Sequence, residues 1–565
     1  MNNGIDVVIV GCGVGGLYTA LNIPMNRNIA IIAKGDCEEC DSYLAQGGIC
    51  MLRDEDDYDA YFNDTMRAGH YENDPRSVDL MIRGSQDVIK DLIGYGVDFQ
   101  RKEDGELDFT REGAHSQPRI LYHEDITGEE ITKHLLAAVR RLPNVKIYEH
   151  VTMVDILTAG EAGRIGAAAG SPMGRALPRS EEHIGYLGSE RERHAAAVNA
   201  EGHSGRTASP LEGLAGLSQG SSSAGENPDG ASAGTGGASA AVPYCRGIIA
   251  VAPADSEFAR DFGVTEGGSG DQISFDPGAG TGAPAANGSN APGPALTDKG
   301  EQVCVLHAPE VVWACGGIGG LFEHSTNFPQ LTGDALAISL KHGIRLENPD
   351  YIQIHPTSFY SEKPGRSFLV SESVRGEGGI LLNEHGRRFV NELLPRDVVS
   401  NAIFREMAEE GTKHVWLSME RIPKDVIVNH FKHIYEHGLE EGYDCTKEPI
   451  PVVPAQHYFM GGVWVDTDSR TSMDHLYAVG ETSCNGVHGK NRLASNSLLE
   501  SLVFAKRAAH AITEESAQVT MNLDQEEELD LKLYENSKDL EESYREAVLG
   551  EIERMKQFRE QQKNR

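Results

Sequence analysis

The sequence DVVIVGCGVGG, residues 6–16, is the most informative stretch of this chain about its fold. Residues 6–10 favour a strand, because all of them after Asp6 are apolar and β-branched, and residues 17–21 after the glycines favour a helix. Glycines with this spacing allow a tight turn, close approach of the backbone to a pyrophosphate, and close packing of the helix. The phosphates would lie at the positive end of the helix. The stretch therefore predicts a dinucleotide-binding unit, although the glycine spacing alone also fits an ordinary turn.

The residues that follow support the dinucleotide interpretation. Residues 28–33, NIAIIA, predict a second strand at the distance of a βαβ unit. An acidic residue usually follows this strand and binds the adenine ribose, but Lys34 stands there. A plain NAD fingerprint is therefore disfavoured.

Length and charge restrict the class of protein. A chain of 565 residues predicts two to four domains with full cores. The formal net charge of -35 argues against nucleic acid or an anionic membrane as a partner. We find no basic and apolar leader and no apolar run near the roughly 20 residues of a membrane span. We expect a cytoplasmic protein.

The cysteines predict neither a disulfide framework nor a metal centre. There are nine of them, scattered along the chain. Cys37 and Cys40 form the one CxxC pair, and a structural zinc would need a second such pair. No iron–sulfur spacing is present, so any electrons would pass through an organic cofactor.

The composition changes between residues 160 and 300. Two tracts, residues 230–241 and 276–288, are rich in glycine, alanine and serine and have too little apolar bulk to offset ordering entropy. Residues 245–252 and 302–307 nevertheless predict strands, so we expect a β-meander with two long insertions. The acidic tail after residue 513 predicts solvated helices.

Five clusters in the second half carry residues suited to a dicarboxylate. Arginine binds a carboxylate through two parallel hydrogen bonds, and imidazole and hydroxyl groups complete its acceptors. The clusters are QIHPT (353–357), SESVRGEGG (371–379), PRD (395–397), HYFMGG (457–462) and Arg492. Singly, each has a structural alternative: His355 can be a buried structural histidine, Arg375 can pair with Glu377, and Arg396 can pair with Asp397. Together they favour a substrate site.

The motifs in this order resemble those of the succinate dehydrogenase and fumarate reductase flavoprotein family. Within that family the chain is most similar to the members that oxidise L-aspartate. The resemblance covers nearly the whole chain outside residues 160–300. It is carried by GCGVGG, SYLAQGGI, REGAHS, HPTSFY, SESVRGEGG, PRDVVS, QHYFMGGV, YAVGE and HGKNRLASNSLLE.

The resemblance implies an α/β fold: a Rossmann-like FAD-binding domain with an inserted α+β capping domain and a short C-terminal helical region. The FAD-binding domain would comprise residues 1–159, 301–349 and 461–513. The capping domain, with the substrate site, would comprise 350–460, and the helical region 514–565. Residues 160–300 would be largely disordered insertions around a strand at 244–252.

The resemblance also implies FAD as the cofactor. Members that oxidise L-aspartate often have lysine at the position of Lys34, which explains the missing acid. Succinate dehydrogenases carry the flavin on a histidine just before the second glycine turn, but here that position is Asp41, so we expect FAD to be non-covalent. The expected FAD-binding residues are Gly11, Cys12, Gly13, Val14, Gly15, Gly16, Lys34, Asp41, Ser42, Ala45, Gln46, Gly47, Gly48, Asp334, Glu481, Ser497 and Leu498.

For the substrate, the resemblance places a set of polar residues around two carboxylates, and Arg396 at the proton-transfer position. The set is Gln353, His355, Ser371, His457 and Arg492. Ser371 stands where threonine is usual. Glu112 is expected to discriminate, because an anion is needed near the ammonium group of L-aspartate and a succinate enzyme has no such cation to bind. A guanidinium pKa above 12 fits charge stabilisation by Arg396 better than proton transfer.

The expected reaction is oxidation of L-aspartate to iminoaspartate by hydride transfer to flavin N5, the first step of NAD biosynthesis through quinolinate. Oxygen or fumarate would reoxidise the flavin, and a quinolinate synthase would consume the unstable product. Two alternatives stay open. One is a fumarate reductase or succinate dehydrogenase flavoprotein subunit, and the other is a non-catalytic flavin-binding interaction protein.

Overall fold

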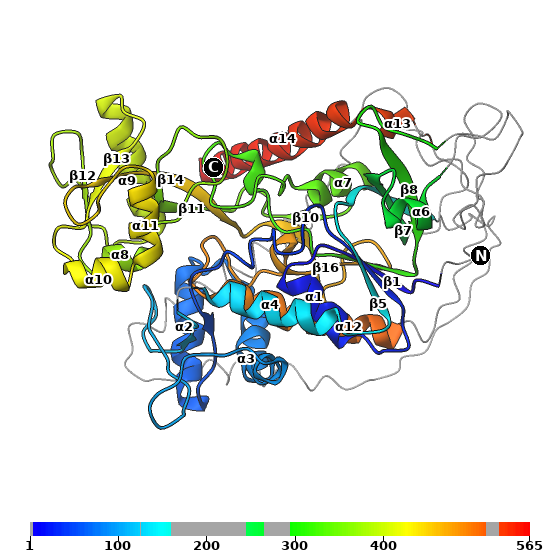
Figure 1. Ribbon diagram of the computed structural model, residues 1–565, viewed down its shortest axis with the longest axis horizontal. Coiled ribbons are helices and arrows are strands. Elements are labelled where there is room, and N and C mark those ends of the chain that lie inside the picture. Colours follow the sequence, from blue (N-terminus) through cyan, green and yellow to red (C-terminus); the bar gives the residue numbers. More distant parts are fainter. Residues whose placement is uncertain are drawn as a thin grey trace, which may run out of the picture. The chain divides into compact units, whose positions relative to one another are not determined.

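The computed structural model describes residues 4–124, 126–159, 244–264, 294–515, 530 and 532–564. They all belong to one compact unit, residues 1–176 and 243–565 (Figure 1). Residues 177–242, which form the second unit, and most of the predicted disordered insertions lie outside the described residues.

A parallel sheet of five strands forms the centre of the unit, in the order β16-β9-β1-β2-β5. The strands are β1 (Val7–Val10), β2 (Ile29–Ile32), β5 (Val145–Tyr148), β9 (Glu310–Trp313) and β16 (Leu476–Ala478). Strand β1 is buried along its whole length, as its β-branched sequence predicts. These elements confirm the predicted α/β fold.

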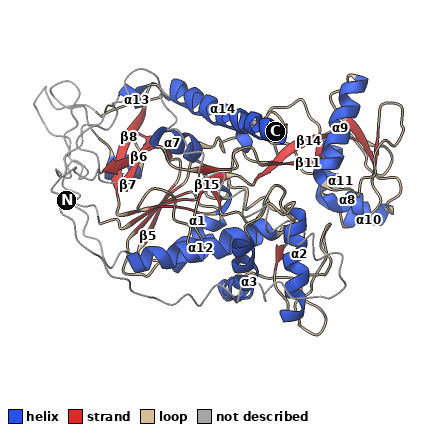
Figure 2. Cartoon of the chain, turned by 180° about the vertical axis from the view of Figure 1, so that it is seen from behind, coloured by secondary structure: helices blue, strands red, loops and turns tan. Residues whose placement is uncertain are grey.

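Successive side chains of β1 enter two different cores, because a strand alternates its faces. Val7 and Ile9 pack with helices on one face. Val8 and Val10 pack on the other face with a second, smaller sheet. Figure 2 shows α1 and α12 on one side of the central strands and β6 to β8 on the other. The helices of the first core are α1 (Val14–Asn22), α2 (Tyr58–Ala68), α3 (Pro75–Tyr95), α4 (Thr127–Val139) and α12 (Asn496–Glu515).

The second sheet confirms the predicted meander. Strands β6 (Thr152–Ala159), β7 (Tyr244–Pro253) and β8 (Glu301–His307) are antiparallel neighbours in this order. The helices beside it are α6 (Glu257–Phe262) and α7 (Asp334–His342). The long insertions predicted between these strands lie outside the described residues.

A separate antiparallel sheet, in the order β11-β14-β13-β12, forms the cap with its own apolar core. Its strands are β11 (Ile352–Phe359), β12 (Ile380–Leu382), β13 (Val415–Ser418) and β14 (Ile450–Phe459). Its helices, yellow in Figure 1, are α8 (Glu372–Gly376), α9 (Arg396–Glu410), α10 (Lys424–Asn429) and α11 (Lys432–Glu440). The exact domain boundaries stay predictions.

Short elements connect these parts. They are β3 (Ile49–Cys50), η1 (Glu55–Asp57), β4 (Ile120–Leu121), η4 (Gly319–Leu321), β10 (Leu346–Glu347), β15 (Gly462–Trp464), η5 (Gly480–Thr482) and β17 (Ser483–Cys484). Strands β10, β15 and β17 form a three-stranded sheet, and β3 pairs with β4.

The tail corrects one prediction. Its helices are α13 (Lys532–Glu535) and α14 (Ser537–Lys563), and α14 is not simply solvated. Tyr544, Val548 and Ile552 are buried in the core that also holds α7, and Met555 is buried as well. The prediction was wrong because charged residues surround an apolar stripe with helical spacing, which charge counting overlooks.

Among the described helices, none is long and apolar enough to cross a membrane.

Candidate active site

A cavity of about 740 Å³ lies among the glycine turn, the loop of residues 39–48 and the cap. Of the predicted FAD-binding residues, all but Val14 and Gly16 line it. A Cβ on Gly16 would lie 2.1 Å from the Gly11 carbonyl oxygen, so this glycine permits the turn to pack on its helix. Gly16 thus shapes the turn without lining the cavity, and Val14 is buried in an apolar core.

The glycine turn fits a pyrophosphate. Gly11 has a φ of 113°, and a Cβ there would lie 2.0 Å from the carbonyl oxygen of Ala314. Helix α1 begins after Gly13, which has no capping side chain, and both Gly13 and Gly15 line the cavity. An uncapped helix start without side chains lets a phosphate approach the backbone N–H groups.

Lys34 and Asp334 occupy the end of the cavity where the ribose is expected. The Lys34 Nζ lies 2.8 Å from Asp334 Oδ2 and 3.0 Å from Thr332 Oγ1. Both residues line the cavity, so an acid is present beside Lys34 although none follows the second strand in the sequence. The ion pair keeps the charge of Lys34 neutralised in this region.

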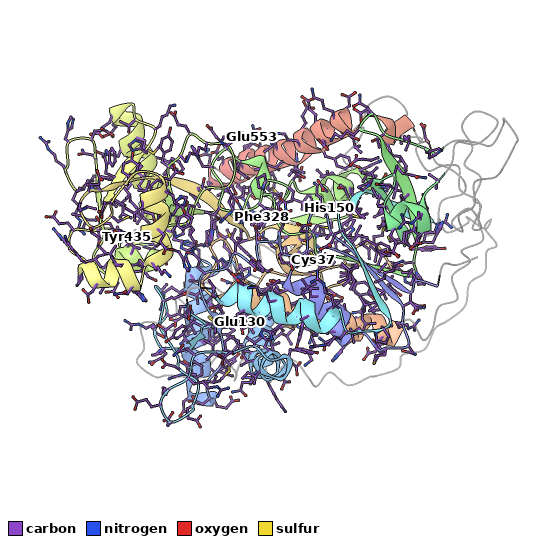
Figure 3. All side chains as sticks on the ribbon, viewed as in Figure 1. Cys37, Glu130, His150, Phe328, Tyr435 and Glu553 are labelled. Atoms are coloured by element: carbon purple, nitrogen blue, oxygen red, sulfur yellow. The ribbon has the colours of Figure 1, made fainter. Side chains whose placement is uncertain are left out.

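Asp41 has an incompletely satisfied carboxyl group. Its Oδ1 accepts a hydrogen bond of 3.0 Å from the backbone N–H of Phe328, while the buried Oδ2 has no hydrogen-bond partner among the described residues. Burial raises the pKa of Asp41 to about 7. Figure 3 shows Phe328 near the middle of the view, between Tyr435 of the cap and His150. A free acceptor on the cavity wall fits a bound polar cofactor.

Gln353 holds two arginines side by side. Its Oε1 accepts hydrogen bonds from Arg396 (3.1 Å) and from Arg492 Nε (3.3 Å), and its Nε2 donates to the Arg492 carbonyl oxygen (3.0 Å). Gln353 does not line the cavity, whereas both arginines do. The amide therefore positions the guanidinium groups instead of facing the substrate space, which refines its predicted role.

The two histidines come from paired strands. Gln353 and His355 lie on β11 and His457 on β14, and the register places Gln353 opposite Tyr458. The rings of His355 and His457 have centroids 5.4 Å apart. Burial lowers the pKa of each histidine well below 6.5; the charge of Arg396 reinforces the shift of His355, and the charges of Arg492 and Arg396 reinforce that of His457. Both are thus neutral imidazoles, and both line the cavity.

Glu112 lies in the same cavity as the arginines. Its Oε2 accepts a hydrogen bond of 2.7 Å from Ser495 Oγ. Burial raises the pKa of Glu112, and the positive charges of Arg396 and Arg492 oppose this rise. Ser371 also lines the cavity, with its Oγ accepting from the backbone N–H of Ser373 at the start of α8 (3.3 Å). The site therefore combines arginines with the half-buried acid Glu112, and Glu372 is a further carboxylate in the cavity lining.

The sequence of this chain matches a known protein family and several known proteins. The family described as FAD binding domain matches residues 6–223 and 273–498. An L-aspartate oxidase of Clostridium perfringens is 37% identical over 94% of this chain and 91% of its own length, and one of Clostridium acetobutylicum is 36% identical over 91% and 88%. The chain belongs to the L-aspartate oxidase family. This confirms the flavoprotein resemblance inferred from the motifs.

Solved structures agree with the L-aspartate oxidase family in fold. The E. coli quinol fumarate reductase FrdA matches with a TM-score of 0.64 at 23% identity, covering 98% of this chain and 74% of that one. Sdh1 of Mycobacterium smegmatis matches with a TM-score of 0.62 at 24% identity, covering 94% and 71%. At this identity the likeness supports the flavoprotein fold alone.

Two predicted alternatives for the arginines are wrong. Arg396 pairs with Glu372, with Nε 2.7 Å from Oε2, and not with Asp397. Arg375 lies 3.7 Å from Glu372 and donates to the Glu392 carbonyl oxygen (2.6 Å), and does not pair with Glu377. Glu372 was missed by sequence reasoning, although its position three residues before Arg375 on one helix was an available signal.

The cysteine pair has no partner that would make it a metal site. Cys37 and Cys40 are free, and the described residues contain no group of three metal-binding side chains.

Proposed function

We propose that this chain oxidises L-aspartate to iminoaspartate, with FAD bound non-covalently along the glycine turn. The observation that carries this proposal is the half-buried acid Glu112 in one cavity with Arg396 and Arg492. Membership of the L-aspartate oxidase family supports the same reaction. It is the first step of NAD biosynthesis through quinolinate.

The cationic side of the cavity binds the two carboxylates of the substrate. Arg492 is buried and forms no ion pair with any described carboxylate, so it has donors free for an anion. The neutral rings of His355 and His457 can each donate one N–H, and Ser371 can donate its hydroxyl. Binding both carboxylates fixes the orientation of the substrate and therefore the direction of its reacting C–H bond.

Glu112 selects the amine. Its half-buried carboxylate can bind an ammonium group through a charge-assisted hydrogen bond, and succinate has no ammonium group to form one. Oxidation removes a hydride from the α-carbon and a proton from the adjoining nitrogen. Because burial raises its pKa, Glu112 is also suited to accept that proton. When bound, FAD supplies the hydride acceptor at N5 of its ring.

Arg396 stabilises negative charge beside the reacting carbon. Its guanidinium is held on two sides, by Glu372 and by Gln353. Burial opposes ionisation of Glu372, but the charges of Arg396 and Arg375 outweigh it and lower the pKa of this carboxyl group. Arg396 is thereby kept charged and oriented, which electrostatic catalysis requires.

The experiment is anaerobic mixing of purified, flavin-loaded protein with L-aspartate, succinate or buffer. The proposal expects loss of the oxidised flavin absorbance with L-aspartate alone, and release of the flavin on denaturation because it is non-covalent. Equal bleaching by succinate would favour the fumarate reductase or succinate dehydrogenase alternative. A flavin that no substrate bleaches would favour a non-catalytic flavin-binding protein.

Several finer points stay predictions. Oxygen and fumarate are both kept as acceptors of the electrons, and a quinolinate synthase as the consumer of the product. The cytoplasmic location and the lack of nucleic-acid and membrane partners also rest on the sequence alone. Rates of flavin reoxidation by oxygen and by fumarate after aspartate reduction would separate the two acceptors.

A further inference from the structure

Two loops bring opposite charges into the active site. The first carries Glu112, and the second carries Arg492 and Ser495 immediately before α12. Behind them, outside the cavity lining, lie His115 and Arg119, both buried. The function proposed above gives these two residues no role.

Both loops contain a strained residue. Ala114 has a φ of 68° and Ser495 a φ of 62°, the left-handed region that favours glycine. Such conformations cost free energy and persist only where neighbouring contacts hold them. The contacts that stabilise Ala114 and Ser495 in this conformation should therefore determine the positions of Glu112 and Arg492.

Arg119 fixes the tautomer of His115. Its guanidinium donates to Asp57 (2.9 and 3.2 Å), to Asp64 (2.8 Å) and to His115 Nδ1 (2.9 Å). Guanidinium has no acceptor, so Nδ1 must be the acceptor and the ring proton must be on Nε2. Burial, followed by the charge of Arg119, lowers the pKa of His115 to about 4, which keeps the ring neutral.

His115 Nε2 therefore donates to the carbonyl oxygen of Ala494, 3.0 Å away. Ala494 lies between Arg492 and Ser495, and the Ser495 hydroxyl donates to Glu112. The His115 backbone N–H also donates to the Glu112 carbonyl oxygen (3.3 Å). One imidazole thus joins the loop of the acid to the loop of the arginine.

Cys50 gives the second loop additional support. Its backbone N–H donates to the Ser495 carbonyl oxygen (3.0 Å), and its thiol lies 3.7 Å from the Ala494 carbonyl oxygen. The thiol is a weak donor at this distance, so the imidazole is the stronger bond to Ala494.

We propose that His115 is a positioning residue that sets the spacing of Glu112 and Arg492, and so discriminates an amino dicarboxylate from a plain one. The inference rests on the function proposed above. Movement of residues 494–495 would disturb the Ser495–Glu112 hydrogen bond and so displace the Glu112 carboxylate. Only a substrate with an amine binds that carboxylate. The same movement would disturb the carboxylate grip of Arg492 less, because Gln353 holds that guanidinium independently.

The test compares His115→Gln with His115→Asn. Glutamine places its amide nitrogen where Nε2 stands, whereas asparagine reaches only as far as Nδ1, so both are polar but only glutamine can donate to Ala494. We expect His115→Asn to raise the KM for L-aspartate about tenfold, as loss of one buried hydrogen bond does. The inhibition constant of succinate should change less than about threefold. His115→Gln should leave both constants close to the parent values.

Each other outcome overturns the inference. Equal values for the two variants, or a proportional change for L-aspartate and succinate, would show that His115 does not discriminate. An asparagine variant that cannot fold or retain flavin, beside a normal glutamine variant, would make His115 a structural residue only. Failure of the proposed function is distinct, because the parent protein itself would then not oxidise L-aspartate.

Discussion

Arg119 and Arg492 are both buried arginines, but they have opposite surroundings. Arg119 is fully buried and bonded to two carboxylates and an imidazole. Burial lowers its pKa, but the bonds to Asp57 and Asp64 outweigh that and raise it. Among the described residues, the hydrogen-bond partners of the Arg492 guanidinium are neutral groups, Gln353 and Ser497, and burial together with Arg396 lowers its pKa to about 10. One guanidinium is saturated, while the other has donors free for an anion.

The partners of a buried charge indicate whether it stabilises the fold or is available to bind a ligand. A buried charge whose partners are all supplied by the chain stabilises the fold. Asp155 is a second example, because Lys341 (2.5 Å), His342 (2.6 Å) and the hydroxyl of Tyr534 (2.7 Å) all bind its carboxylate. A buried charge left without a counter-ion costs free energy unless a ligand brings one. The comparison therefore supports the proposal that Arg492 binds a carboxylate of the substrate.

The largest expected effect is on stability. Arg119→Met leaves two buried carboxylates without a partner and should lower the free energy of unfolding by about 3–5 kcal/mol. Arg492→Met removes an uncompensated cation and should change it by less than about 1 kcal/mol, while abolishing aspartate binding. Denaturant unfolding of both variants, with and without flavin, measures the difference. If Arg492→Met were as destabilising as Arg119→Met, the comparison would fail.

Loss of Arg396 should affect the rate more than the fold. We expect Arg396→Gln to lower kcat for L-aspartate about 10²–10³-fold, as removal of one electrostatic stabiliser does. Flavin content should be unchanged, since Arg396 bonds to Glu372 and Gln353 in the cap. Arg405→Gln, an exposed arginine on the same helix, is the matched control and should keep parental kinetics.

Glu112→Gln should alter specificity. Loss of a charge-assisted hydrogen bond to the ammonium should raise the KM for L-aspartate about 10–100-fold. Succinate should bind at least as well as before, because the carboxylate repels anions and the amide does not. Steady-state kinetics with succinate as inhibitor measure both, and exposed Glu106→Gln serves as the control. Parallel loss of both ligands would show that Glu112 is not the amine site.

The smallest expected effect is a pH dependence in the Arg119 network. The folded pKa of His115, about 4, is below its ordinary value of 6.5, so only the unfolded chain binds the proton between these values. The contribution to stability is complete above pH 6.5 and is lost as the pH falls. Between pH 7.5 and 5 the parent should lose about 2 kcal/mol more than His115→Gln. Identical pH profiles of unfolding would show that His115 is not held neutral.

The local sequence correctly predicted the first strand, turn and helix, and it indicated the residue types of the candidate site. The β-branched run of β1 and the glycines after it predicted a strand, a turn and a helix, because these depend on residues adjacent in the chain. The arginine, histidine and acidic clusters could be recognised by residue type, and all but Gln353 of the predicted substrate and catalytic residues line the cavity.

The pairing of charges could not be predicted in the same way. The natural sequence-local partners, Glu377 for Arg375 and Asp397 for Arg396, are not the ones used. Glu372 and Arg396 are separated by 24 positions, and Asp57 and Arg119 by 62. The buried stripe of α14 was hidden for a related reason, since its partner α7 lies almost 200 residues earlier.

Residue types and their spacing were sufficient to predict the secondary structure near the glycine turn, the expected cofactor and the set of charged residues available for a dicarboxylate. They were not sufficient to predict which of those charges neutralise one another and which stay free for a ligand, because that depends on the folded arrangement. The reason is that strand and turn formation depend on neighbours along the chain, whereas the state of a buried charge depends on whatever folding places within hydrogen-bonding distance of it.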